Sequence, residues 1–362
     1  MTKRLIQLAG TAALSLAVTA SALADIKIND NFSVGGYGVG EANVNQSKPI
    51  TGSSSTTSKL DGDAYKLWSN ITFAPVTGTI SVYAGQSGDP VILDAYATYD
   101  AGSGVKVTFG KFLSWMGYEA FDPINMTQVT YGWATPQGFG VGNIPGYHTG
   151  VKVEQGDDTY TVGLAVLDSV DPSSAAKTGA DKGDGDLRNG PGFEAYYTYK
   201  GVKNLTLFGG LTYEHNTGVN GAISHDYGTD RDATAIDLWA QYVVGDTTYA
   251  AEYSYRVDDY KANFAQESDG HKLNSSFFLA EVQQAINKQW AIMGRIGWIA
   301  KDYKTSGVKK PSATTFTIAP TLTLTANLSV VFEYSYTHYK DADYENGLKS
   351  GNFVAAQFRF KF

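Results

Sequence analysis

The last twelve residues of the chain, Gly351–Phe362, have the side-chain pattern of a strand with two different faces. Val354, Ala356, Phe358, Phe360 and Phe362 fall on one side of an extended strand, and Gln357, Arg359 and Lys361 fall on the other. Successive side chains of a strand point to opposite faces. In a transmembrane β-barrel the apolar face meets lipid and the polar face meets an aqueous lumen. A soluble sandwich would bury the apolar face and place a free carboxylate beside it.

The terminal aromatic residue and the apolar residues at every second position before it resemble the assembly signal of Gram-negative outer-membrane proteins. Phe358, Phe360 and Phe362 carry this resemblance. It implies a location in the outer membrane, with the lipid bilayer, lipopolysaccharide and the barrel assembly machinery as partners.

Residues 1–24 have the features of a secretory signal peptide. Lys3 and Arg4 precede an apolar run from Leu5 to Val18, and Ala22–Ala24 form a small-x-small cleavage triplet. We therefore predict a signal peptide over 1–24 and one barrel domain over 25–362, exported through the periplasm. No later stretch has 18 consecutive apolar residues, so hydropathy predicts no spanning helix.

The remaining chain predicts about 16 strands, within a range of 14 to 18, joined alternately by short and long connections. The first strand runs from Phe32 to Val44, and a loop is expected from Asn45 to Gly62. The weakest assignments are Pro320, which would remove a ladder hydrogen bond, and the segment 276–286, whose two faces are poorly separated. The 24 Tyr and 17 Phe residues are typical of interfacial aromatic girdles, and the chain has no Cys. The fold class is all-β: a transmembrane antiparallel β-barrel with short periplasmic turns and long extracellular loops.

Sixteen strands enclose a water-filled lumen. By the alternation, charged side chains that point inward comprise Lys66, Asp94, Lys106, Lys152, Glu194, Asp237, Glu252, Arg256, Glu281, Arg295, Glu333 and Arg359. The longest interval without alternation, Leu113–Gly146, follows the fifth predicted strand and carries Glu119 and Asp122. In trimeric general porins, the loop after the fifth strand folds into the lumen. The same arrangement here would set an acidic loop against basic wall residues, whereas the alternative is a loop on the outer rim.

We therefore predict as pore-lining or constriction residues Lys66, Asp94, Lys106, Glu119, Asp122, Lys152, Glu194, Arg295, Glu333 and Arg359. The segment Val107–Glu119 with Asp122-Pro123, and the segment Ile28–Tyr37, resemble the OmpL-like beta-barrel porins. This resemblance implies an outer-membrane channel for passive diffusion of small hydrophilic solutes and ions.

Sequence motifs for catalysis are absent. The chain has no H-E-x-x-H, no G-x-S-x-G and no thiol, so we predict no enzyme, no cofactor and no metal. His148 and Glu154 are expected to form an ordinary polar pair in the lumen. The net charge of −8 disfavours nucleic acid as a partner. Two alternatives are kept: a barrel that anchors a surface binding or adhesion function, and a hydrolase at the rim. The sequence leaves open the solute, the pore radius and whether the protein is a monomer or a homo-oligomer.

Overall fold

The computed structural model describes residues 25–85, 89–170, 191–216, 231–260, 272–304, 310–341 and 347–362. The predicted signal peptide and most of the loop that follows Asp168 lie outside these residues. The strands are β1 (Ile26–Asn29), β2 (Phe32–Pro49), β3 (Ser55–Phe73), β4 (Val76–Gly85), β5 (Val91–Gly102), β6 (Val105–Leu113), β7 (Tyr147–Gly156), β8 (Tyr160–Leu167), β9 (Gly192–Tyr199), β10 (Leu205–Asn216), β11 (Arg231–Val244), β12 (Thr247–Tyr260), β13 (Lys272–Ala285), β14 (Trp290–Tyr303), β15 (Ser312–Thr323), β16 (Leu328–Lys340) and β17 (Leu348–Lys361). A short 3-10 helix, η1 (Pro123–Asn125), lies between β6 and β7.

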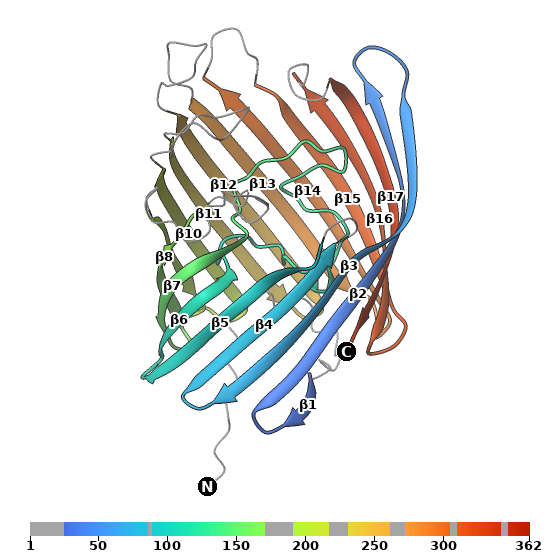
Figure 1. The fold of residues 1–362 in the computed structure, drawn as a ribbon. Helices are drawn as coiled ribbons and strands as arrows, with labels where there is room; N and C mark the ends of the chain where they lie inside the picture. The colour runs from blue at the N-terminus through green and yellow to red at the C-terminus, as the bar shows by residue number, and fades with distance from the viewer. Residues whose placement is uncertain are drawn as a thin grey trace.

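Strands β2 to β17 form a closed antiparallel barrel of sixteen strands, as predicted (Figure 1). Each strand pairs with the next along the chain, and β17 pairs with β2 from Leu348 and Pro49 down to Lys361 and Tyr37. Closure gives every strand a hydrogen-bonded neighbour on both sides, which a spanning sheet needs because lipid offers its backbone no partners. Among the residues described, no helix has the length and apolarity to cross a membrane.

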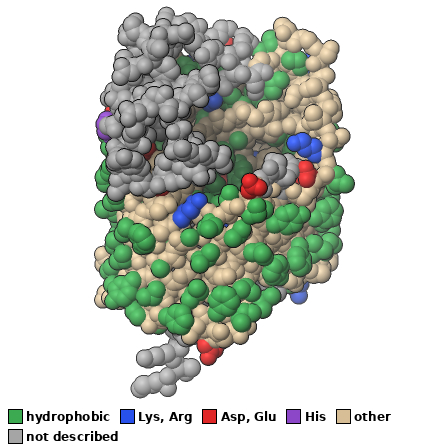
Figure 2. Space-filling model, viewed as in Figure 1, with side chains coloured by type: hydrophobic (Ala, Val, Ile, Leu, Met, Phe, Trp, Pro, Cys, Tyr) green, Lys and Arg blue, Asp and Glu red, His purple; other side chains and the backbone are tan. Residues whose placement is uncertain are grey.

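The outer surface of the barrel is apolar and the inner surface is polar. On β15, Phe316 and Ile318 are exposed on the outside, whereas Thr317 between them is buried inside. Figure 2 shows the resulting belt of hydrophobic side chains around the lower wall. The connections at the lower end in Figure 1 are short, for example Gly245-Asp246 between β11 and β12. The predicted short turns at one end of the barrel and the predicted outward position of the apolar residues are confirmed.

The loop predicted over Asn45–Gly62 is wrong. Most of this stretch continues β2 and β3 as a hairpin that rises above the rest of the barrel (Figure 1), with Asn45 opposite Thr57 and Asn43 opposite Lys59. The sequence of this stretch shows no apolar–polar alternation, because both faces of the hairpin are solvated and carry polar residues. The Thr and Ser residues nevertheless suit a strand, since β-branched side chains favour extended backbone.

The barrel wall differs in height around its circumference. Strands β4 to β9 have 8 to 12 residues, whereas β10 to β17 have 12 to 14 and β2 and β3 have 18 and 19. The wall is therefore shorter along β4 to β8, as Figure 1 shows, and the surface above these strands is hollowed in Figure 2.

The two weak points of the sequence pattern have structural causes. Phe277 and Leu279 on β13 point inward and are fully buried against Phe139 and Val141, so this strand carries apolar side chains on both faces. At Pro320, the ladder between β15 and β16 is interrupted, and pairing resumes at Thr321.

The terminal strand closes the barrel at the position where its aromatic residues reach the outer surface. Phe358 and Phe360 are exposed outside, whereas Gln357 and Arg359 are buried inside. Two hydrogen bonds of 3.0 Å join the backbones of Phe362 and Gly36. Below this point β1 pairs with β2, with Ile26 opposite Val34. The two ends of the described chain therefore lie along the same strand.

Replacing Phe362 with Asp should lower the amount of assembled protein in the outer membrane several-fold, because the terminal aromatic is lost and a second carboxylate is placed at the lipid boundary. The heat-modifiable band of outer-membrane fractions measures this amount. Lys361→Ala, one residue away on the lumen face, is the matched control. Equal assembly of both variants would contradict the role of the terminal aromatic.

Candidate functional site: a segment folded into the lumen

The interval between β6 and β7, residues 114–146, lies inside the barrel, where Figure 1 shows it as a green trace. We call it the infolded segment. Counted from β2, β6 is the fifth strand of the barrel, as predicted. The segment contacts inward side chains from almost every part of the wall, from Lys66 on β3 to Arg359 on β17. The outer-rim alternative is therefore wrong.

Carboxylates on β9, β11 and β12 accept hydrogen bonds from the backbone of the first part of the infolded segment. Glu194 on β9 binds the N–H of Trp115 at 2.8 Å. Asp237 on β11 binds the N–H of Gly117 at 2.8 Å, and Glu252 on β12 binds the N–H of Tyr118 at 2.9 Å. Carboxyl oxygens are strong hydrogen-bond acceptors, so these side chains hold a backbone that has no ladder partner of its own.

Farther along, Glu333 on β16 accepts hydrogen bonds from the backbone N–H groups of Val129 and Thr130, at 2.6 and 3.0 Å. Inward arginines bind the carbonyl groups of the infolded segment in a complementary way. Arg359 donates to the carbonyls of Met126 and Gln128, Arg295 to that of Thr130, and Arg256 to that of Gly142. The wall thus satisfies both N–H and C=O groups of an irregular chain, as buried backbone requires.

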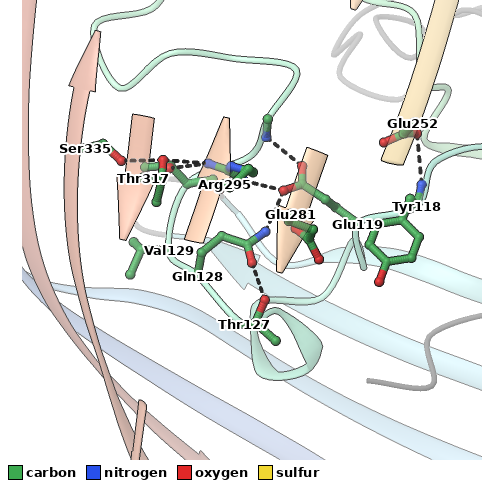
Figure 3. Close-up of polar contacts among 12 residues, drawn as sticks. Tyr118, Glu119, Thr127, Gln128, Val129, Glu252, Glu281, Arg295, Thr317 and Ser335 are labelled. Atoms are coloured by element: carbon green, nitrogen blue, oxygen red, sulfur yellow. Dashed lines mark hydrogen bonds and ion pairs between the residues drawn. The ribbon is translucent and has the colours of Figure 1, made fainter. Parts of the chain in front are cut away.

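At the centre of these contacts, Arg295 forms an ion pair with Glu119 (Figure 3). The Glu119 side chain is 3% exposed. Its second oxygen accepts the N–H of Gly132 at 2.6 Å, and Gln128 donates to its first oxygen at 2.6 Å. Because both charges are removed from water, the pair is stable only through these additional hydrogen bonds.

A second ion-pair group joins the infolded segment to β3 and β5. The Lys66 ammonium lies 2.9 Å from Asp122 and 3.1 Å from Asp94. It also donates to the hydroxyl of Tyr147 at 3.2 Å, and the Tyr37 hydroxyl donates to Asp122 at 3.1 Å. Lys66 is buried, whereas the Asp122 side chain is 25% exposed. This group is therefore open to the lumen through Asp122.

Lys152 and Glu154 form a third group on β7, 3.8 Å apart. Glu154 accepts hydrogen bonds from the indole of Trp115 at 3.0 Å and from the hydroxyl of Tyr196 at 2.7 Å. The expected pair of His148 with Glu154 is wrong, because His148 lies 3.2 Å from Glu194 instead. His148 and Glu154 lie six residues apart on the same strand, which is about 20 Å at the usual strand rise, so Glu194 on β9 is the closer partner.

The predicted pore-lining residues fall into two sets in the structure. Glu119, Glu194, Arg295, Glu333 and Arg359 are buried in contacts with or within the infolded segment. Lys66, Asp94, Lys106, Asp122 and Lys152 lie on β3, β5, β6, β7 and the infolded segment, and all but Lys66 are partly exposed. A pore-lining role for any of them stays a prediction.

Aromatic residues of the infolded segment form a feature that the sequence analysis missed. The rings of Tyr131 and Trp133 stack at 4.8 Å, and Phe121 lies 6.2 Å from Tyr131 and 6.1 Å from Tyr147. The available signal was the density of aromatic residues in an interval that has no alternation. Among the residues described, no group of three His, Cys, Asp or Glu could hold a metal ion.

The family described as "Putative beta-barrel porin-2, OmpL-like" matches residues 69–362 of the chain. No curated protein sequence matches the chain. Solved structures with the same fold include OmpF of Salmonella typhi in complex with daunomycin, at a TM-score of 0.63 and 13% identity over 94% of this chain and 100% of that one. The outer-membrane channel DcaP of Acinetobacter baumannii has a TM-score of 0.61 and 14% identity, with the same coverage. The trimer form of OmpT, an outer-membrane protein of Vibrio cholerae, has a TM-score of 0.61 and 12% identity over 92% and 100% of the two chains.

Replacing Arg295 with Met should loosen the infolded segment, because Glu119 would remain buried without its cation. Breaking one partner of a buried pair costs about 3 to 5 kcal/mol. Hydrogen exchange of the amides from 117 to 132 in the folded protein measures the loss as faster exchange. In the double variant Glu119→Gln with Arg295→Met, part of the protection should return. Unchanged exchange in the single variant would contradict the role of this pair.

Proposed function

Because the chain belongs to the OmpL-like beta-barrel porin family, we propose that solutes cross it between the infolded segment and the inner wall of β3 to β7. The protein is an outer-membrane porin for the passive diffusion of small hydrophilic solutes and ions. In this proposal, the partly exposed pore-lining residues line the path, and the buried ones hold the infolded segment.

The observation that supports this path is the uneven exposure of the inward charged residues. On β5, β6 and β7, inward Asp94, Lys106, Lys152 and Glu154 are partly exposed. On β9 to β17, the inward charged residues that bind the infolded segment are buried. Water and solutes therefore have surface to contact on the first side, while the segment covers the second. Glu119, Glu194, Arg295, Glu333 and Arg359 would accordingly shape the constriction by holding the segment.

The charges around Asp122 favour a mild preference for cations. On the partly exposed side, Asp94 and Asp122 share Lys66. Unbalanced negative charge close to a narrow path attracts cations, and it is screened less there than at an open surface.

We further propose that the protein catalyses no reaction. Two candidates for acid–base chemistry are engaged around the infolded segment: Ser114 donates to Glu194 at 2.7 Å, and His148 lies against the same carboxylate. All three side chains are buried. A rim hydrolase would need such groups in contact with solvent, where the described residues hold the pair of His215 and Asp232, with side chains 45% and 27% exposed.

For export and assembly, we propose cleavage of residues 1–24, insertion by the barrel assembly machinery through Phe358, Phe360 and Phe362, and contact of the outer surface with lipid and lipopolysaccharide. A homo-oligomer fits this proposal, since the structures of similar fold include a trimer form. The exposed apolar belt supports the lipid contact.

The purified protein in a planar bilayer should give stepwise ion conductance, and proteoliposomes should swell in small sugars, because a water-filled path crosses the barrel. A barrel that only anchors a surface binding function would show neither. The absence of both signals from correctly folded protein would therefore favour the adhesion alternative and contradict the channel.

Replacing Asp122 with Asn should lower the cation preference about two- to fivefold, because one partly exposed negative charge is removed beside the path. Reversal potentials under a salt gradient measure the permeability ratio. The control is Asp30→Asn, at a highly exposed turn outside the lumen. Equal shifts in the two variants would contradict a path along Asp122.

A further inference from the structure

The infolded segment presents an aromatic surface to the lumen. Phe121, Tyr131 and Trp133 are each partly exposed, and their rings follow one another at 6.2 and 4.8 Å. The hydroxyl of Tyr131 donates to the carbonyl of Phe121 at 2.7 Å, which fixes the two residues relative to each other. Trp133 also packs on the buried cluster around Phe139, but Phe121 and Tyr131 are not part of that cluster. Phe121 and Tyr131 contact Tyr147 and Trp133 and remain partly exposed, so part of this aromatic surface is accessible to a solute.

Negative charge lies at one end of this aromatic surface. Asp122 follows Phe121 directly, and together with Asp94 it shares the single ammonium group of Lys66. Two carboxylates with one cation leave an excess of one negative charge. Of these three side chains, Asp122 is the most exposed, so the excess negative charge faces the lumen at the residue that follows Phe121 in the chain.

Rings in this lumen already hold ammonium groups. The Lys66 ammonium lies 5.6 Å from the ring centre of Tyr147, Lys152 lies 4.6 Å from that of Phe112, and Lys301 lies 5.2 Å from that of Phe139. A cation within about 6 Å of an aromatic face is attracted by the negative charge of that face, most strongly where water is excluded. The chain thus uses the same interaction internally at several positions.

We propose that Phe121, Tyr131 and Asp122 form a binding site for organic cations, in which an ammonium group on a small apolar body contacts the rings and the carboxylate. The aromatic faces would take the apolar body, and Asp122 would take the charge. Neutral compounds would lack the second contact, and anions would be repelled by the excess carboxylate. The proposal rests on the proposed function only for access, because the site lies beside the proposed path.

Benzyltrimethylammonium tests the proposal in two measurements. Added to single channels in a planar bilayer, it should lower the conductance in a concentration-dependent manner, whereas neutral benzyl alcohol should not. Isothermal titration of the detergent-solubilised protein should show binding of the cation, and this measurement needs no conductance.

The variants Tyr131→Leu and Asp122→Asn should each raise the half-blocking concentration and the dissociation constant about tenfold, as expected for the loss of one cation contact. Tyr160→Leu, which removes an aromatic residue stacked on Tyr197 in the wall, is the matched control and should leave both values unchanged. Heat-modifiability and the conductance without blocker establish that the variants are folded.

Equal binding of benzyl alcohol, or unchanged binding in both site variants, would overturn the cation site. A conducting protein that neither binds nor is blocked would also overturn it, and would leave the porin path standing. A protein that binds the cation through Tyr131 and Asp122 but never conducts would support the site and contradict the path.

Discussion

Backbone N–H and C=O groups that are shielded from water in this protein must form hydrogen bonds with other parts of the chain. In the membrane wall, closure of β17 on β2 meets that requirement, because each strand is then hydrogen-bonded on both sides. Inside the lumen, the irregular backbone of residues 114–146 has the same requirement and, apart from the bridge between Ala134 and Gly140, no ladder to meet it. Charged side chains of the wall meet it instead, with carboxylates on N–H groups and arginines on carbonyls.

Because the charged side chains of the wall bind the infolded segment, they are no longer exposed to the lumen. Glu194, Glu333 and Arg359 would be exposed lining residues in an empty barrel, but here they are buried against the infolded segment. In the proposed path, the surface left for solutes consists of the partly exposed groups on β5 to β7 and of the side of the segment that faces them. The segment therefore defines the path in two ways, by the volume that it occupies and by the wall charges that it covers.

Contact with the infolded segment also explains the apolar inward residues of β13. Phe277 and Leu279 break the rule that inward residues are polar, because the segment brings Phe139 and Val141 to them. Their burial adds an apolar contact to the polar contacts that hold the segment, at roughly 25 cal/mol per Å² of apolar surface removed from water. A strand with two apolar faces inside a barrel is thus a sign of something packed within the lumen.

The sequence by itself determined the barrel, its approximate strand number, the inward and outward faces, and the long interval without alternation, but it left open whether that interval enters the lumen or lies on the outer rim. These properties follow from a period of two, which each strand displays within about ten residues whatever its neighbours are. The same rule missed the β2–β3 hairpin, whose two solvated faces have no such period.

Only the tertiary structure decided which charges pair. Glu119 meets Arg295 across 176 residues, and Val129 meets Glu333 across 204. Nothing in the local pattern around Glu119 distinguishes a partner on β14 from one on any other strand, because the infolded segment has no periodicity to set its register. Its course is selected by the joint satisfaction of many buried polar groups, a condition that exists only once the barrel has closed around it.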